Sequence, residues 1–136
     1  MIDHTGVIVS DFTKSKAFYS AALGAIGIAV LKEFPASVTG NTDVAGYGAQ
    51  EASAQGLSPE FWLARGEPGS IPVHIAFRVS SRALVDAFYN AAIGAGGRDN
   101  GAPGLRPQYH PNYYGAFVLD PDGYNVEAVC HKAEGA

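Results

Sequence analysis

The sequence predicts an α+β domain made of two similar strand–helix–three-strand (βαβββ) modules, because one segment of the chain occurs twice. Residues 4–25 align without gaps with residues 74–95, and both copies begin with a histidine and share Val-Ser, Ala-Phe-Tyr, Ala-Ala and Gly-Ala in register. Such identity at a fixed spacing indicates a duplicated half-domain. The chain of 136 residues has the length of one domain. We therefore expect all 136 residues to form a single domain, with repeats at about 1–65 and 73–131 and a linker at 66–72.

The first module is expected to begin with a strand over Ile2–Ser10, whose alternation places Val7 and Val9 on one face and His4 on the other. A helix follows. Its N-cap is the Ser-Asp pair that ends the strand, its apolar residues recur at helical spacing, and Gly24 stops it. The strands expected after it, with a turn region at 35–43, are Gly27–Phe34, Val44–Ala49 and Glu60–Ala64.

The second module repeats this order. Its first strand, Val73–Val79, places His74 on the face opposite its valines, isoleucine and phenylalanine, and a serine-capped helix follows. A proline-stiffened connection over Gly101–Asn112 precedes two strands joined by Asp120-Pro121-Asp122-Gly123. In that turn Pro sets φ at the second position and Gly tolerates positive φ at the fourth. The strands expected after the helix are Gly97–Asn100, Tyr113–Leu119 and Tyr124–His131.

Neither module can bury both faces of its own sheet, so the two should pack as a pseudo-symmetric pair. The helices then cover one face of each sheet, and the other faces curve together and line a cup-shaped cavity. By strand parity, His4 and His74 lie on the cavity side. Aligning Val126-Glu127-Ala128 with Phe61-Trp62-Leu63 places Glu127 and Trp62 at equivalent positions, also facing the cavity.

Two histidines and one glutamate at a cavity are a ligand set for a divalent metal ion. Glu127 lies inside a strand, where a carboxylate is costly to bury unless it is paired or bound to a cation. A set of two histidines and one carboxylate leaves coordination positions open for substrate and water. We therefore expect His4, His74 and Glu127 to bind Zn, Ni, Co, Mn or Fe. The alternative is that both histidines are ordinary strand residues satisfied by neighbours.

These features resemble the vicinal oxygen chelate superfamily, which includes glyoxalase I, fosfomycin-resistance thiol transferases, extradiol dioxygenases and bleomycin-resistance proteins. The resemblance covers nearly the whole chain. It rests on the strand with His4, the helix containing Phe18-Tyr19 to Leu23-Gly24, the strand with His74, and Asp120-Pro121-Asp122-Gly123-Tyr124-Asn125-Val126-Glu127. It implies the glyoxalase-like fold, paired βαβββ modules around a metal-bearing cup, with ligands at His4, His74 and Glu127.

The sequence departs from this resemblance at the fourth corner of the cup. Glyoxalase I would have a glutamate where Trp62 stands, and an indole cannot bind a metal. Glu60, two residues earlier on the same face, is the alternative ligand. The resemblance thus argues against glyoxalase I activity and favours a three-ligand site. Trp62 is then expected to form an apolar wall of the cup that contacts substrate, or to be a core residue.

The aromatic segment from Arg106 to Tyr114 is predicted to be either a surface connection or a rim of the cavity. In the second case His110 is a general acid/base or an extra metal ligand, Tyr113 binds substrate or shares the catalytic role, and Tyr114 contacts substrate. Arg78 shares the face of His74 and is expected to bind an anionic substrate or to pair with Glu127. His131 is expected to be a bystander at a strand end, and Cys130 to be a core residue.

Composition narrows the class of partner. The net charge of −4 is mild and there is no basic cluster, which argues against nucleic acid and anionic membrane. No apolar run has the length of a membrane span, and the single cysteine fits a reducing cytoplasm. The resemblance also implies a homodimer, in which the cup forms within one chain or between two chains.

Two functions follow as hypotheses. The first is a metal-dependent lyase, isomerase, transferase or dioxygenase that acts on a small oxygen-rich substrate chelated in the cup. The second is a metal-free protein that binds an aromatic or cationic small molecule, as bleomycin-resistance proteins do.

Overall fold

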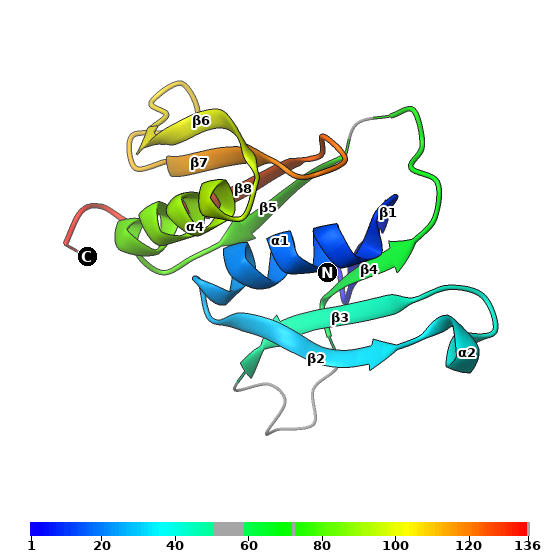
Figure 1. The fold of residues 1–136 in the computed structure, drawn as a ribbon. Helices are drawn as coiled ribbons and strands as arrows, with labels where there is room; N and C mark the ends of the chain where they lie inside the picture. The colour runs from blue at the N-terminus through cyan, green and yellow to red at the C-terminus, as the bar shows by residue number, and fades with distance from the viewer. Residues whose placement is uncertain (51–58, 72, 136) are drawn as a thin grey trace.

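The computed structural model describes residues 1–50, 59–71 and 73–135, and it confirms the α+β fold of two βαβββ modules (Figure 1). The first module contains β1 (Thr5–Val9), α1 (Phe12–Gly24), β2 (Ile28–Phe34), α2 (Ala36–Thr39), β3 (Val44–Ala49) and β4 (Phe61–Arg65). The second contains β5 (His74–Arg78), α4 (Arg82–Gly94), β6 (Arg98–Leu105), β7 (Tyr114–Leu119) and β8 (Asn125–Cys130).

The two sheets have the same topology, as a duplication requires. Their strand orders are β1-β4-β3-β2 and β5-β8-β7-β6, and in each the first and last strands of the module are parallel neighbours. Gly6 lies opposite Trp62 in the first sheet, and Ala76 lies opposite Glu127 in the second. Since Gly6 and Ala76 are equivalent in the repeat, the expected equivalence of Trp62 and Glu127 is confirmed.

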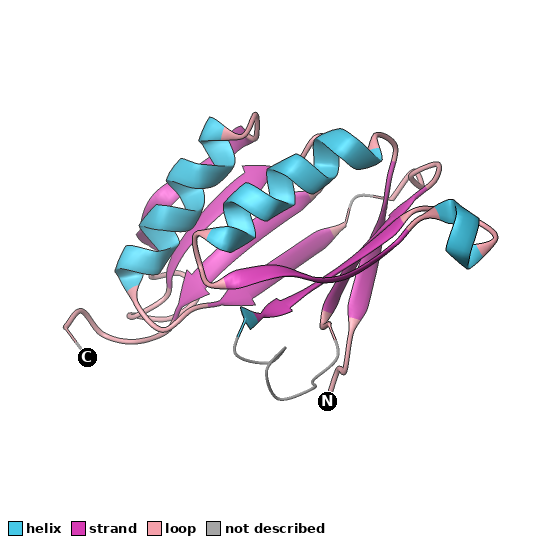
Figure 2. Ribbon diagram, turned by 60° about the horizontal axis from the view of Figure 1, so that its bottom comes forward, coloured by secondary structure: helices cyan, strands magenta, loops and turns pink. Residues whose placement is uncertain are grey.

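Both long helices lie on the same side of the sheets, which leaves the other side of each sheet uncovered (Figure 2). Accordingly, Val7 and Val9 of β1 are buried beneath the helices, whereas Ile8 is 43% exposed. In β5 the same alternation leaves His74 exposed and its neighbour Ile75 half-buried. The predicted parity of both first strands is therefore confirmed.

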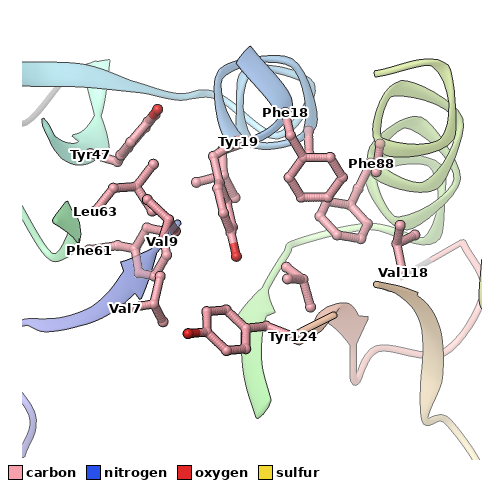
Figure 3. Close-up of a cluster of buried hydrophobic side chains, with 14 of the residues drawn as sticks. Val7, Val9, Phe18, Tyr19, Tyr47, Phe61, Leu63, Phe88, Val118 and Tyr124 are labelled. Atoms are coloured by element: carbon pink, nitrogen blue, oxygen red, sulfur yellow. The ribbon is translucent and has the colours of Figure 1, made fainter. Parts of the chain in front are cut away.

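Helix α1 connects the cores of the two modules (Figure 3). Its Tyr19 faces the first sheet, and its neighbour Phe18 points toward Phe88 of α4 and Val118 of β7. A Cβ at Gly97 would lie 2.5 Å from Val118 Cγ1 and 2.7 Å from Phe18 Cε2. Only glycine leaves room for this contact, so Gly97 is part of the joint between the modules.

The predicted Asp-Pro-Asp-Gly turn between β7 and β8 fastens the second module to the first. Its Asp120 accepts a hydrogen bond from the buried phenol of Tyr19 at 2.6 Å. Its Asp122 accepts one from the hydroxyl of Ser10 at 2.5 Å, and Tyr124 donates one to the carbonyl of Ile8 at 2.5 Å. We call these three contacts the inter-module clamp. They set the positions of β8, and so of Glu127, relative to β1.

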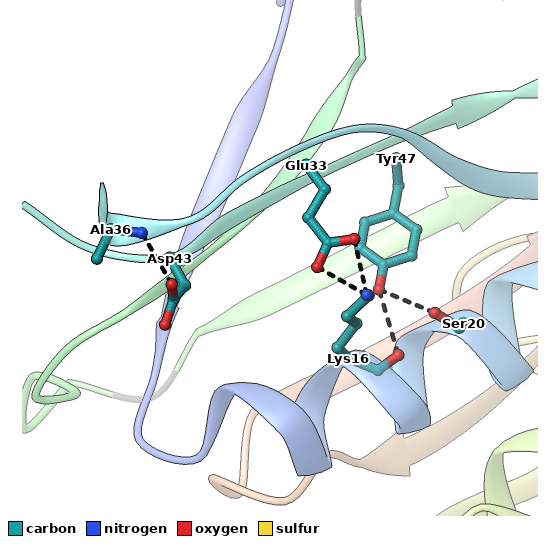
Figure 4. A network of polar contacts seen from close by, with 6 residues as sticks. All are labelled: Lys16, Ser20, Glu33, Ala36, Asp43 and Tyr47. Carbon is teal, nitrogen blue, oxygen red and sulfur yellow. Dashed lines mark hydrogen bonds and ion pairs between the residues drawn. The ribbon is translucent and has the colours of Figure 1, made fainter. Parts of the chain in front are cut away.

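A polar network joins α1 to strands β2 and β3 of the first sheet (Figure 4). Lys16 Nζ contacts both carboxylate oxygens of Glu33 at 2.7 and 2.8 Å, and the Tyr47 phenol donates to the carbonyl of Lys16 at 3.3 Å. Asp43 Oδ1 accepts from the N–H of Ala36 at 2.9 Å, at the start of α2. The short helix α2 was not predicted within the turn region 35–43.

The strand predicted at Gly97–Asn100 is wrong in length. Strand β6 runs over Arg98–Leu105 and so takes up half of the expected connection over Gly101–Asn112. Its pairing with β7 is interrupted twice, and Gly101 has φ of +146°. These irregularities, together with Pro103 and two glycines, removed the alternation by which a strand is recognised. The described helices include none that is long and apolar enough to cross a membrane.

The buried tyrosines predict a loss of stability at alkaline pH. Burial, and then the neighbouring Asp120, raises the pKa of Tyr19, and burial raises the pKa of Tyr47. In the unfolded chain these phenols ionise above roughly pH 10, while the folded state retains their protons. The contribution of these tyrosines to the free energy of unfolding should therefore be constant below that pH and fall as pH rises through it. Urea unfolding checks this. Tyr19→Phe should reduce the fall, and an equal fall in that variant would contradict the assignment.

Candidate functional site

Glu127 lies at the centre of the candidate site, in the interior of β8. Its side chain is 2% exposed, and its Oε2 lies 3.1 Å from Nε2 of His74 on the adjacent strand β5. Its Oε1 accepts a hydrogen bond from the phenol of Tyr113. The buried carboxylate is therefore satisfied by two groups of its own chain. The burial of Glu127 therefore does not by itself require a cation.

These residues line an open cavity of about 420 Å³ on the uncovered side of the second sheet. The ring of Phe117, on β7, stacks near that of His74, with centroids 6.3 Å apart and planes at 26°. Sequence reasoning missed Phe117, Asn125 and Tyr109. The alternation of β7 would have indicated Phe117, because Phe117 is paired with Glu127 in the register. The complete lining is His74, Tyr109, His110, Tyr113, Phe117, Asn125, Glu127 and His131.

His110 and His131 form a hydrogen-bonded pair at this cavity. The N–H of Asn112 donates to His110 Nδ1 at 3.1 Å, which leaves Nε2 as the nitrogen that carries the His110 proton. That Nε2 lies 2.8 Å from Nδ1 of His131 and therefore donates to it. His131 was expected to be a bystander, but it shares the cavity. In the sequence, its place on the same strand face as Glu127 was the feature that indicated this position.

Tyr113 is held as a hydrogen-bond donor by its surroundings. Burial raises the pKa of its phenol, and the hydrogen bond to Glu127 and the negative charge of Glu127 raise it further. The phenol therefore keeps its proton at neutral pH. Tyr113 thus contacts the buried carboxylate directly, and its acid/base role stays a prediction.

His4 does not reach this cavity within the chain. It lines a separate hollow of about 320 Å³ with Thr5, Gly6, Val44 and Trp62, and its Nδ1 lies 2.6 Å from Asp3 Oδ1. We call this hollow the N-terminal half-cup and the cavity around Glu127 the C-terminal half-cup. They share no lining residue, and the described parts of the chain contain no cluster of three His, Cys, Asp or Glu residues placed to hold a metal ion.

A sequence model of the glyoxalase/bleomycin resistance protein/dioxygenase superfamily matches residues 1–128. The chain belongs to this superfamily. A glyoxalase/bleomycin resistance protein from Albidiferax ferrireducens is 26% identical, with a TM-score of 0.68 over 96% of this chain and 98% of that one. A glyoxalase I mutant from Zea mays is 22% identical, with a TM-score of 0.70 over 94% of this chain and 46% of that one.

The fosfomycin resistance protein FosX from Listeria monocytogenes, determined with Mn(II) and sulfate, has the same fold. It is 15% identical, with a TM-score of 0.66 over 97% of this chain and 93% of that one. No curated protein shows a significant match to this chain. The comparisons thus establish the superfamily and the fold.

The remaining predicted residues of this superfamily member lie away from both half-cups. Arg78 is exposed at the end of β5 and forms no ion pair within the described residues, so the predicted pair with Glu127 is absent. The Tyr114 phenol donates to Asp86 of α4 at 2.8 Å, on the helix side of the sheet. Glu60 is exposed and does not line the hollow of His4. Cys130 is buried in the core, as expected.

Proposed function

We propose that this superfamily member is a divalent-metal-dependent enzyme in which His74 and Glu127 of one protomer and His4 of a second copy bind the ion. The observation that carries the proposal is the 3.1 Å separation of His74 Nε2 and Glu127 Oε2 in a cavity. Two cis ligands at about 2.1 Å from one ion lie about 3 Å apart, so this donor pair fits a shared metal. An imidazole with a carboxylate suits Zn, Ni, Co, Mn or Fe.

A homodimer accounts for the separation of the two half-cups. The uncovered sides of both sheets carry the candidate residues, and within one chain His4 lies in a different hollow from His74. A two-fold dimer that apposes the N-terminal half-cup of one copy and the C-terminal half-cup of the other forms two identical three-ligand sites. Because the only cysteine is a free, buried thiol, we place this dimer in the reducing cytoplasm.

The bound ion would supply Lewis acidity to adjacent oxygens of a small substrate. The protein residues would orient the substrate and exclude water. Phe117 and Tyr109 form the aromatic wall of one half-cup, and Trp62 of the second copy would close the other side. His110 presents its Nε2–H at the same cavity, where it could transfer a proton once its contact with His131 is broken. Trp62 stands where glyoxalase I would have a glutamate ligand, and an indole cannot bind a metal. This favours a reaction other than that of glyoxalase I.

A second candidate function is a metal-free binding protein, and one observation favours it. Tyr113 and His74 already satisfy Glu127 without an ion, and three aromatic side chains line the cavity. Such a site can hold a flat aromatic or cationic molecule by stacking.

Metal content distinguishes the two functions. We expect about one ion per chain in the parent protein purified without chelators, and a loss of at least tenfold in affinity in His74→Ala and Glu127→Gln, which remove ligands. His131→Ala is the matched histidine control and should retain the metal. Elemental analysis and isothermal titration calorimetry measure both quantities. A parent protein without stoichiometric Mn, Fe, Ni, Co or Zn would overturn the metal-dependent function and favour the binding protein.

A further inference from the structure

The two carboxylate oxygens of Glu127 have different partners. Oε1 accepts the phenol proton of Tyr113, and Oε2 lies 3.1 Å from His74 Nε2. Because the side chain is 2% exposed, bulk water has almost no access to either oxygen. One oxygen is therefore occupied from within the chain, and the other is directed at the histidine.

The phenol fixes the orientation of the carboxylate, with one oxygen toward Tyr113 and the other toward His74. The terminal torsion of a glutamate is broad, so burial alone leaves the carboxylate free to turn. An O–H···O⁻ bond is short and strong, and it removes that freedom. Both backbone polar groups of Tyr113 are hydrogen-bonded. Its N–H donates to the carbonyl of His110 at 3.2 Å, and its carbonyl accepts from the N–H of Arg106 at 2.7 Å. Its ring centroid lies 4.8 Å from that of Tyr109.

Gly115 provides the space for this contact. A Cβ at that position would lie 3.1 Å from Tyr113 Cε1 and 3.2 Å from Glu127 Oε1. These distances are closer than ordinary van der Waals contact. An alanine would therefore push the phenol or the carboxylate aside, so the glycine is a condition for the hydrogen bond.

We propose that Tyr113 is a positioning residue that occupies Oε1 of Glu127 and leaves Oε2, beside His74, as a single-oxygen ligand. The consequence for a metal rests on the proposed function, whereas the orientation of the carboxylate does not. A carboxylate that binds through one oxygen leaves one more coordination position open than one that binds through both. That position is available to a second oxygen of the substrate.

Tyr113→Phe keeps the ring and removes the donor. We expect the Mn(II) affinity, measured by isothermal titration calorimetry on the purified protein, to fall about 10- to 100-fold, the range found when a partner of a metal ligand is lost. The electron paramagnetic resonance spectrum of bound Mn(II) should change as well, because Glu127 can then bind through both oxygens. Gly115→Ala should reproduce the loss with the phenol present. Tyr114→Phe is the matched control, since that phenol bonds Asp86, and its affinity should equal that of the parent.

Crystal structures of the metal-free parent and Tyr113→Phe separate this inference from the proposed function. In the variant, the Glu127 carboxylate should turn so that Oε2 leaves His74. A parent that binds no Mn(II), together with a turned carboxylate in the variant, defeats the metal function and supports the positioning role. An unchanged carboxylate overturns the positioning role. If the parent binds Mn(II), equal affinity in Tyr113→Phe overturns it as well.

Discussion

Mixing the His4→Ala and His74→Ala variants should restore metal binding that neither variant has alone. If each site takes His4 from one copy and His74 with Glu127 from the other, a mixed dimer contains one intact site and one site that lacks both histidines. Random exchange of subunits then restores about a quarter of the parent's metal per chain. The measurement is elemental analysis after the mixture has been dialysed against metal and then against buffer.

The same arrangement predicts which mixtures of two variants do not recover metal binding. Glu127→Gln mixed with His4→Ala should also restore metal, since the two changes lie in different half-cups. Glu127→Gln mixed with His74→Ala should not, because both changes damage the C-terminal half-cup. Equal recovery in all three mixtures would contradict a site shared between copies. Sedimentation that shows only monomers at micromolar concentration would contradict the dimer itself.

Asp120→Ala should reduce the free energy of unfolding by about 3 kcal/mol, the largest effect on stability that we expect from a polar residue. The Asp120 side chain is buried and accepts hydrogen bonds from the Tyr19 phenol at 2.6 Å and from the N–H groups of Asp122 and Tyr124 at 2.8 and 2.9 Å. Burial raises the pKa of Asp120 although these donors act in the opposite direction. Alanine would leave three donors without an acceptor: the Tyr19 phenol of the inter-module clamp and the two backbone N–H groups of the turn.

Equilibrium urea denaturation measures this loss, and two variants calibrate it. Tyr19→Phe removes one donor and leaves the two backbone bonds, so about 1–2 kcal/mol should be lost. Asp120→Asn keeps an acceptor for the backbone N–H groups and should lie between the parent and the alanine variant. A loss below about 1 kcal/mol in Asp120→Ala would show that the hydrogen bonds of Asp120 contribute little to stability.

Local patterns predicted most of the fold because the features they report are local. Alternation placed Val7 and Val9 against the helices and His74 on the open face, since neighbouring side chains of a strand point to opposite sides. Strand β6 was underestimated for the converse reason. Its glycines and proline pair with β7 through an irregular register, and such pairing leaves no periodicity in the sequence.

The candidate site was predicted in part. His74 and Glu127 lie together as expected, because both face the open side of neighbouring strands in the second sheet. The hydrogen bond of Tyr113 to Glu127 could not be predicted, because it joins the end of an irregular connection to a strand interior. The space that Gly115 leaves for it is equally invisible in a linear pattern.

The sequence by itself determined the duplication, the superfamily, the parity of the first strand of each module, and the presence of Trp62 at the position equivalent to Glu127. All of these depend on residue identity and on spacing along the chain. Only the tertiary structure decided that His4 and His74 lie in different hollows, that Tyr113 occupies one oxygen of Glu127, and that His110 bonds His131. The separation of the two histidines depends on how the inter-module clamp sets one sheet against the other, through residues a hundred positions apart in the chain such as Tyr19 and Asp120. The contacts of Tyr113 and His110 depend on how the connection after β6 folds onto β8 within the second module.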